Sequence, residues 1–180
     1  TNIGTLNLVD LDTKVLQDSF FLNSGTIIHS SDSILQFKQA SQLNNTGTYE
    51  FQSSGDIASV DIGNVINNGG TFRKNWSNNI SNVQPAFNNQ GIIDVQTGTF
   101  RLSGGGPDWR DSSANVHGNA LLELSSGTFN LNGVFQSAGD GKVSLTKMAD
   151  LVESARDSAN GLVQRYKVSD EERDLLNLTP

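Results

Sequence analysis

Short segments in which apolar and polar residues alternate recur along residues 1–146, and most of them follow a turn residue. Residues 87–106 (FNNQGIIDVQTGTFRLSGGG) show the pattern twice, in IIDV after Gly91 and in TFRL after Gly98. Alternation with a period of two is typical of β-strands, because successive side chains point to opposite faces. So few apolar residues cannot form a core alone, and we therefore expect these strands to stack on copies of themselves.

The copies align with a period close to 21 residues when the residue that precedes each first strand is used as the reference. These reference residues are Gly25, Gly47, Gly70, Gly91, Ala120 and Gly141. The one long interval, 29 residues between Gly91 and Ala120, is interpreted as an insertion at about residues 104–119. Segments 4–8, 98–102 and 127–131 (GTLNL, GTFRL and GTFNL) are interpreted as copies of the second strand.

Apolar or aromatic residues stand two positions after each reference residue. This column contains Ile27, Tyr49, Phe72, Ile93, Leu122 and Val143, and we expect it to point into the core. The next column is mostly polar; in it Glu50, Arg73 and Asp94 alternate in charge and are expected about 5 Å apart on adjacent parallel strands. Four positions after the reference residues, His29 and Lys74 interrupt another apolar column, which predicts a bulge or a register shift near them.

A short period, short strands and the absence of helices between them predict an all-β fold, a parallel β-helix (β-solenoid) of about six coils over residues 1–146. Paired asparagines at 44–45, 67–68 and 88–89 recur at equivalent positions. We expect them at the corners, where Asn tolerates left-handed backbone and stacked copies can hydrogen-bond as a ladder. The alternative is a β-sandwich built from hairpins, which the regular spacing and the scarcity of two-residue hairpin turns disfavour.

The pattern changes after Leu145. Apolar residues from Met148 to Tyr166 are spaced by three and four positions, which predicts an amphipathic helix, and Ser169 with Glu172 forms a capping-box pattern. We therefore expect residues 147–180 to form an α-helical segment. It caps the solenoid, links it to another domain or mediates oligomerisation, or is foreign to the protein.

Composition agrees with a narrow, repetitive core. Hydrophobic residues make up 35% of the chain, below the roughly 45–50% of ordinary globular domains. The absence of Cys excludes disulfides and thiolate chemistry, and the net charge of −7 argues against nucleic acid or an anionic membrane as a partner. No apolar run is long enough for membrane insertion. Without an initiating Met or a signal peptide, Thr1 is expected to be an internal or mature N-terminal residue, with more solenoid or another copy of the protein before it.

Residues 104–119 are the strongest candidate for a site, because loops on a regular solenoid often carry function. Trp109 suits stacking on a sugar ring, and Asp108, Arg110 and Asp111 suit hydrogen bonds to its hydroxyl groups. The segment is interpreted as a structural, binding or catalytic loop, since paired carboxylates also suit glycosidic cleavage.

Trp76, in the sequence NWSNN, is a second candidate for an exposed aromatic residue at a binding site. His29 and His117 are about four coils apart in the alignment and are not expected to form a metal or catalytic pair. The chain has no P-loop, GxSxG or HExxH motif. We therefore predict no catalytic residue, no metal site and no cofactor.

The stretches FNNQGIIDVQTGTFRLSGGG and LLELSSGTFNLNG resemble the repeats of large secreted bacterial β-helix proteins. These are the filamentous-haemagglutinin-like and autotransporter-passenger families, whose coils read N-x-G-x-apolar-x-apolar. The resemblance covers roughly residues 1–146 and implies a right-handed parallel β-helix that is secreted or exported to the bacterial cell surface, often long and adhesive. It carries over no catalytic residue, and the tail departs from it.

Three functions follow as alternatives. The first is a structural or adhesive, non-catalytic segment (an adhesin, stalk or scaffold) of an extracellular or surface protein, which binds a host or surface glycan or protein. The second is a carbohydrate-active β-helix enzyme, a polysaccharide lyase or hydrolase with a cleft near Asp94, Asp108 and Asp111. The third is an assembly module of a fibre or phage-like appendage, which associates through the open solenoid end or the C-terminal helix.

Overall fold

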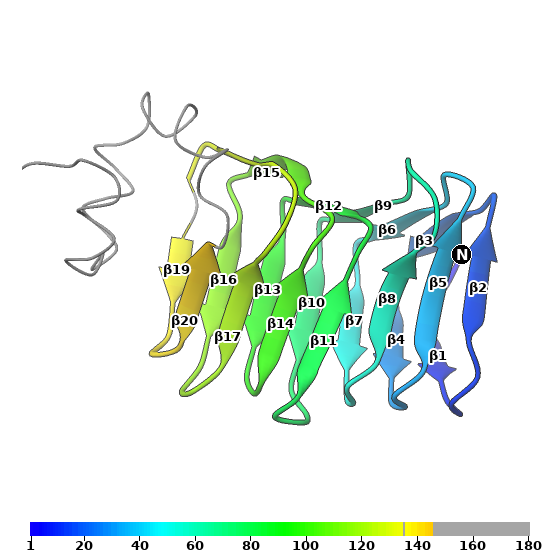
Figure 1. The fold of residues 1–180 in the computed structure, drawn as a ribbon, viewed down its shortest axis with the longest axis horizontal. Helices are drawn as coiled ribbons and strands as arrows, with labels where there is room; N and C mark the ends of the chain where they lie inside the picture. Colours follow the sequence, from blue (N-terminus) through cyan, green and yellow to red (C-terminus); the bar gives the residue numbers. More distant parts are fainter. Residues whose placement is uncertain (135, 146–180) are drawn as a thin grey trace, which may run out of the picture. The chain divides into compact units, whose positions relative to one another are not determined.

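The computed structural model describes residues 1–134 and 136–145, which form an all-β parallel solenoid (Figure 1). Each coil contributes one strand to each of three sheets, and every strand pairs in parallel with its counterpart in the next coil. Six coils contribute to all three sheets, and β19 and β20 continue two of them. The prediction of a parallel solenoid of about six coils is confirmed, and the sandwich alternative is wrong.

We number the sheets in the order in which the first coil visits them. Sheet 1 contains β1 (Thr5–Leu8), β4 (Thr26–His29), β7 (Thr48–Phe51), β10 (Thr71–Lys74), β13 (Ile92–Val95), β16 (Ser113–Val116) and β19 (Gln136–Ala138). Sheet 2 contains β2 (Lys14–Gln17), β5 (Ile34–Lys38), β8 (Asp56–Ser59), β11 (Ile80–Val83), β14 (Thr99–Leu102), β17 (Leu121–Leu124) and β20 (Lys142–Leu145). Sheet 3 contains β3 (Phe20–Asn23), β6 (Gln42–Asn45), β9 (Val65–Asn68), β12 (Ala86–Asn89), β15 (Gly106–Arg110) and β18 (Phe129–Asn132).

The glycine before each of four sheet 1 strands is required by the close approach of successive coils. A Cβ atom at Gly25, Gly47 or Gly70 would lie 2.1 Å from the carbonyl oxygen of the equivalent glycine one coil earlier. At Gly91 the corresponding distance is 2.2 Å. Only a residue without a side chain fits there. The recurrence that revealed the period in the sequence is thus a steric condition for stacking.

The predicted inward column is confirmed for its first four members and is wrong for the last two. Ile27, Tyr49, Phe72 and Ile93 follow one another in register along sheet 1. The next member of that row is Ala114, whereas Leu122 and Val143 continue the row of Phe100 in sheet 2. The long interval in the sequence therefore marks a change of sheet.

Residues 104–119 are consequently not an insertion. They contain β15 and β16, which are regular members of sheets 3 and 1. The three segments interpreted as copies of one strand also belong to different sheets. Residues 4–8 contain β1 of sheet 1, residues 98–102 contain β14 of sheet 2, and residues 127–131 contribute to β18 of sheet 3. The coil has three strands, and the alignment recognised only two of them.

The register of sheet 1 is continuous at His29 and Lys74, so the predicted bulge is absent there. Both residues pair directly with Phe51 of the coil between them. Their side chains point inward and are buried. A register shift is found elsewhere, in sheet 3, between Gly106 and Trp109 of β15. The polar residues are therefore part of the core.

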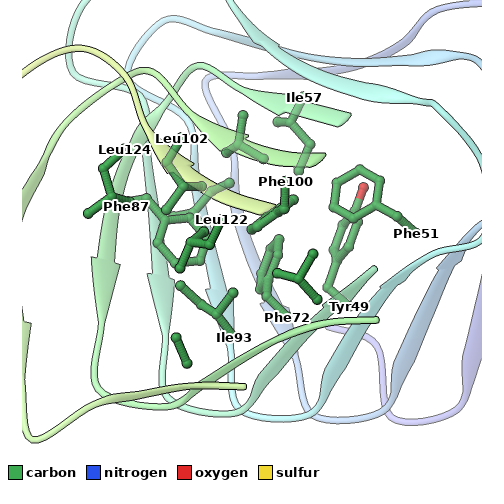
Figure 2. Packing of buried hydrophobic residues seen from close by; sticks show 14 of the residues in the cluster. Tyr49, Phe51, Ile57, Phe72, Phe87, Ile93, Phe100, Leu102, Leu122 and Leu124 are labelled. Atoms are coloured by element: carbon green, nitrogen blue, oxygen red, sulfur yellow. The ribbon is translucent and has the colours of Figure 1, made fainter. Parts of the chain in front are cut away.

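Aromatic side chains from consecutive coils fill the centre of the solenoid (Figure 2). The rings of Tyr49 and Phe72 are stacked, with centroids 4.7 Å apart and an angle of 6° between their planes. Phe87 meets Phe72 edge-on at 5.0 Å, and Phe100 of sheet 2 lies 5.6 Å from Phe51. Each such pair stabilises the fold by about 0.5–1.5 kcal/mol beyond the burial of its area.

The expected asparagine ladder is confirmed. It lies at the C-terminal ends of the sheet 3 strands and has two columns. In the buried column each side-chain amide donates to the carbonyl oxygen of the next at 2.7 or 2.8 Å, through Asn2, Asn23, Asn45, Asn68 and Asn89. In the outer column Asn88 donates to Asn67, which donates to Asn44. The buried ladder ends where β15 places Trp109 opposite Asn89. The Nδ2 of Asn89 has no hydrogen-bond partner among the described residues.

The helical segment predicted for residues 147–180 lies outside the described residues. Within residues 1–134 and 136–145, no helix is long and apolar enough to cross a membrane.

Candidate functional site

Trp76 is a large exposed aromatic side chain that lines a groove on the surface of the solenoid. It lies in the turn of residues 75–79, which joins β10 to β11, and 67% of the residue is exposed. This turn is one residue longer than the two equivalent turns before it, 30–33 and 52–55. Ser77 adopts φ of 67°, in the left-handed region. The longer turn therefore carries the indole out of the core, and the expected exposure of Trp76 is confirmed.

A groove of about 370 Å³ runs across these three turns, and we call it the Trp76 groove. Its walls come from the equivalent corners of the second, third and fourth coils. It is lined by Ser30, Ser31, Asp32, Gln52, Ser53, Ser54, Trp76, Ser77 and Asn79. Apart from the indole, every lining side chain carries a hydroxyl, an amide or a carboxylate. A smaller groove, of about 160 Å³, is lined by Asp108 and residues of sheet 3.

Hydrogen bonds tie the three turns to one another. The backbone amide of Ser54 donates to Oδ1 of Asp32 at 2.7 Å, and the hydroxyl groups of Ser54 and Ser77 lie 2.9 Å apart. The hydroxyl group of Ser53 donates to the carbonyl oxygen of Ser31 at 2.7 Å. Each turn is thus fixed to the turn of the neighbouring coil. The lining of the groove is therefore held in place by bonds within the protein.

The ammonium group of Lys74 lies inside the coil at this corner. It donates to the carbonyl oxygens of Ser53 at 3.2 Å and Trp76 at 3.1 Å, and to the hydroxyl oxygen of Ser81 at 3.2 Å. Lys74 is only 1% exposed, and its three donors have three neutral acceptors. Burial lowers the pKa of Lys74 to about 8, so that the group is still charged at neutral pH. One buried cation therefore joins two of the three groove turns.

His29 occupies the equivalent inward position two coils earlier. Its Nδ1 lies 3.1 Å from the hydroxyl group of Tyr49, and its Nε2 lies 3.0 Å from the hydroxyl group of Ser33. Burial lowers the pKa of His29 to about 4, so the ring is neutral at pH 7. A Cβ atom at Gly55 would lie 2.4 Å from Nε2, which explains the glycine in the next turn. Buried polar side chains therefore precede the first and the third turn of the groove, with Phe51 between them in the same row.

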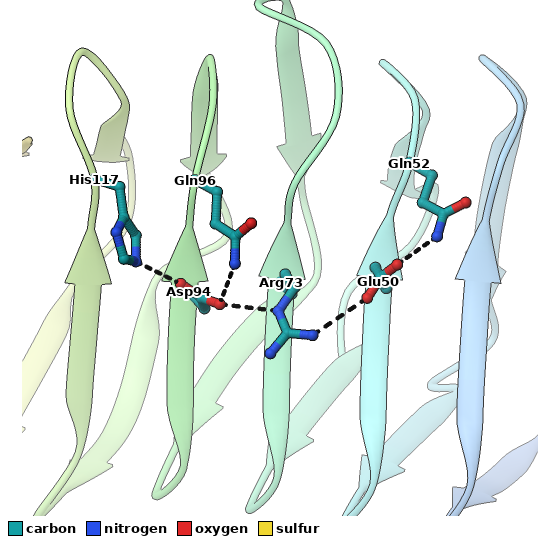
Figure 3. Close-up of polar contacts among 6 residues, drawn as sticks. All are labelled: Glu50, Gln52, Arg73, Asp94, Gln96 and His117. Carbon is teal, nitrogen blue, oxygen red and sulfur yellow. Dashed lines mark hydrogen bonds and ion pairs between the residues drawn. The ribbon is translucent and has the colours of Figure 1, made fainter.

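A row of charged and amide side chains crosses the outer face of sheet 1 (Figure 3). Nη1 of Arg73 lies 3.4 Å from Oε2 of Glu50, and its Nε lies 2.9 Å from Oδ2 of Asp94. The hydrogen bond to Asp94 raises the pKa of Arg73. Gln96 and His117 also contact Asp94, at 2.9 and 3.1 Å. The expected alternation of charge is confirmed, and both carboxylate oxygens of Asp94 are engaged.

Trp109 is not on a loop, contrary to the expectation from sequence. It points inward from β15 and is 1% exposed. Its Nε1 donates to the carbonyl oxygen of Phe87 at 2.6 Å, and its ring lies 5.8 Å from that of Phe129. The alternation along β15 explains this, because the strand turns every second side chain into the core. The indole of Trp109 therefore has no face available for stacking on a sugar.

The charged residues next to Trp109 in the sequence do not point into the core with it. Asp108 is half-buried and forms an ion pair with exposed Arg110, with Oδ1 and Nε 2.6 Å apart. Asp111 follows β15 with φ of 43°, and its Oδ1 accepts a hydrogen bond from the backbone amide of Val134. Each carboxylate thus has a structural contact within or beside sheet 3.

The three aspartates proposed for a catalytic cleft do not line a common groove. Asp94 belongs to sheet 1, whereas Asp108 lines a second groove of about 160 Å³ with residues of β9 and β12 and their following turns. Neither Asp94 nor Asp111 lines that groove. Among the described residues, no cluster of three or more His, Asp or Glu side chains is suited to hold a metal ion.

No family model, curated protein or solved structure matches this chain. The structure brings one of the five candidate residues, Trp76, to the larger groove, and it places Asp108 at the smaller one.

Sequence reasoning missed the residues that surround Trp76. A signal for them was present, because the pairs Ser30–Ser31 and Ser53–Ser54 and the residue Ser77 recur at intervals close to the period. Serine that recurs in equivalent turns indicates a corner with aligned hydroxyl groups.

Proposed function

We propose that this chain is a structural segment of a secreted or surface-exposed bacterial β-solenoid protein, and that it binds a glycan or a protein without turning it over. The observation that carries this proposal is the Trp76 groove. It is lined by an exposed aromatic ring and by turns that are hydrogen-bonded to one another. A rigid scaffold that presents a pre-formed groove suits recognition.

The non-catalytic part of the proposal follows from how the carboxylates are used. Glycosidic cleavage usually requires two carboxylates on either side of the bond. Asp32 is the single carboxylate among the residues that line the Trp76 groove, and its Oδ1 accepts a backbone hydrogen bond. Asp94 is bonded to Arg73, and Asp108 is bonded to Arg110. The location outside the cell is supported by the resemblance of the repeats to secreted β-helix families.

The test combines binding with turnover. The chain is applied to an array of bacterial and host glycans and to host extracellular-matrix proteins, and the same polysaccharides are incubated with it and examined for new reducing or unsaturated ends. We expect binding without products, and loss of binding in Trp76→Ala. Ile62→Ala, at a fully exposed residue outside the groove, serves as the control and should bind normally. Product formation that disappears in Asp108→Asn or Asp111→Asn would establish the enzyme instead.

A second candidate, an assembly module, is favoured by one observation. The first coil exposes several large apolar side chains, Ile3, Leu11 and Phe20 among them. Its strands β1, β2 and β3 lie at the edges of the three sheets and pair on one side only. Edges of this kind associate with further strands. Sedimentation of the chain and of Leu11→Lys/Phe20→Lys tests this candidate, and a monomer at all concentrations in both proteins would argue against it.

A further inference from the structure

We propose that the Trp76 groove binds a neutral saccharide, with the indole of Trp76 as the stacking platform and the buried ammonium group of Lys74 as the group that positions it. This inference rests on the proposed binding function and names its ligand class. It commits to a carbohydrate; a protein ligand at the same groove is an outcome of the test that would overturn it.

The lining of the groove selects a ligand covered with hydroxyl groups. Sites for drug-like molecules are lined mostly by aliphatic and aromatic side chains, with a few polar groups. Here the proportions are reversed, because Trp76 is the one large apolar side chain and the rest are serines, amides and Asp32. Serine hydroxyl groups both donate and accept hydrogen bonds, as sugar hydroxyl groups do. The volume of about 370 Å³ falls in the range of small-molecule sites.

The charges at the groove oppose each other. Asp32 is exposed there, and its carboxylate would repel a uronate or a sulfated sugar. The ammonium group of Lys74 lies behind Ser53 and Trp76, interacts electrostatically with Asp32, and would repel an amino sugar that carries a proton. Because each charge offsets the attraction that the other would exert on an ionic sugar, a neutral ring is the best-matched occupant. Oδ2 of Asp32, for which no hydrogen bond is found among the described residues, is available to accept one from a sugar hydroxyl.

Lys74 fixes the platform from inside the coil. Its bond to the carbonyl oxygen of Trp76 holds the turn that carries the indole, and its bond to Ser53 ties that turn to the preceding coil. Lys74 does not line the groove and so does not touch a ligand there. It is a positioning residue, whose effect on binding depends on its proton. A fixed platform loses less conformational freedom on binding than a mobile one.

The stacking contact has a direct optical test, because the two tryptophans differ in exposure. Iodide reaches the exposed Trp76 and not the buried Trp109, so quenching of fluorescence by iodide reports on Trp76. We expect short neutral oligosaccharides (gluco-, galacto- and manno-oligosaccharides) to protect Trp76 from iodide and to bind in titration calorimetry. Oligouronates and chitosan oligomers should give neither effect. Trp76→Ala should weaken binding about tenfold, and Trp76→Phe should retain part of it.

The positioning role is tested by the pH profile of binding. The charged groups that act on Lys74 are the carboxylates of Asp32 and Asp56. In the native chain the affinity for the neutral saccharide should fall between pH 7 and pH 9.5, as Lys74 loses its proton. In Lys74→Met the affinity should be several-fold lower and independent of pH across that range, with iodide quenching increased because the Trp76 turn is released. Circular dichroism and thermal unfolding establish that each variant is folded. Because Trp76→Ala changes an exposed side chain, the test of the ligand class does not depend on whether Lys74→Met folds.

The outcomes separate this inference from the proposed function. Binding of oligouronates or chitosan that depends on Trp76 would overturn the ligand class while leaving a binding segment. Saccharide binding unchanged in Trp76→Ala would overturn the site, and a protein ligand that protects Trp76 would overturn the carbohydrate assignment; both leave a binding function. Failure of every saccharide to bind or to protect Trp76 would overturn the inference. Conversion of a saccharide into products would overturn the proposed non-catalytic function itself.

Discussion

The same interior column of sheet 1 is polar in one part of the solenoid and apolar in another. Along one row in continuous register the residues are Leu8, His29, Phe51, Lys74, Val95 and Val116. His29 and Lys74 lie beneath the Trp76 groove, which spans the second to fourth coils. In the fifth and sixth coils the row is valine, and the corresponding turns line neither groove.

The difference between the two parts of this column shows how the buried polar side chains affect the turns. A buried valine needs no hydrogen-bond partner. A buried polar side chain does need partners, because they offset its lost hydration. The chain provides these partners from the turns, Ser33 for His29 and Ser53 and Trp76 for Lys74. Each of the three groove turns is therefore hydrogen-bonded to a buried polar side chain. The valines of the fifth and sixth coils need no such bonds from their turns.

The largest expected effect tests what the two regions share, the glycine stack. In Gly70→Ala the new Cβ would lie 2.1 Å from the carbonyl oxygen of Gly47, and two backbones would have to separate. We expect the free energy of unfolding to fall by more than about 3 kcal/mol in urea titrations. Gly4→Ala is the matched control in the same column, because no atom lies within 4 Å of its added Cβ among the described residues. Equal stability of the two variants would contradict the steric explanation.

The glycine stack is also the part of the fold that could be predicted from sequence. A steric rule that applies from the second to the fifth coil produces the same residue at a fixed interval, so the sequence alone reveals Gly25, Gly47, Gly70 and Gly91. In the sixth coil Ser112 takes this position, and the interval is lost there. The asparagine ladder was predictable for the same reason, since each Asn bonds to its own copy.

The assignment of strands to sheets was not predictable from the same patterns. Gly91 and Gly98 both precede short alternating strands, but one strand belongs to sheet 1 and the other to sheet 2. Local alternation carries no information on which sheet a strand joins. The strand β15 (GPDWR) begins with Gly and Pro, residues typical of a loop, and the prediction of a loop there places Trp109 wrongly. The groove was missed because it is formed by contacts between turns of different coils.

The second effect concerns the polar part of the column and appears in acid. His29 has a pKa of about 4 in the folded chain against 6.5 when exposed, so the unfolded chain takes up its proton first as the pH falls. The stability due to neutral His29 is complete above pH 6.5, decreases between pH 6.5 and about 4, and changes no further below that. The loss is at most about 3 kcal/mol.

The contribution of His29 is isolated by comparing urea titrations of the native chain and of His29→Gln from pH 7 to pH 4. Gln keeps one donor and one acceptor but does not titrate, so the variant should lose less stability over this range. Carboxylates contribute equally to both proteins. Identical pH dependence in the two would contradict the assignment of a neutral, buried His29.

The third effect has the opposite sign and appears in alkali. Lys74 has a folded pKa of about 8 and an ordinary value of 10.5, so the folded chain releases its proton before the unfolded chain does. The free energy of unfolding should therefore rise between about pH 8 and pH 10, by about 1–2 kcal/mol once screening by solvent in the groove is allowed for. Lys74→Met should show no such rise. Measurement stops at pH 10, because burial raises the pKa of Tyr49 and tyrosine ionisation then favours the unfolded state.

The smallest effect belongs to the outer face of sheet 1, where the polar row crosses the boundary between the two regions. Arg73 bonds Glu50 and Asp94 on the strands at either side, but about a third of its side chain is exposed. Ion pairs of this kind stabilise a protein by at most about 1 kcal/mol. A double-mutant cycle of Arg73→Ala and Asp94→Ala should give a coupling free energy of about 0.5 kcal/mol that decreases in 1 M salt. The more exposed pair of Arg110 and Asp108 should give a smaller coupling. A coupling above about 2 kcal/mol at Arg73 would mean that the outer row, and not the interior column, determines how the third to fifth coils are held together.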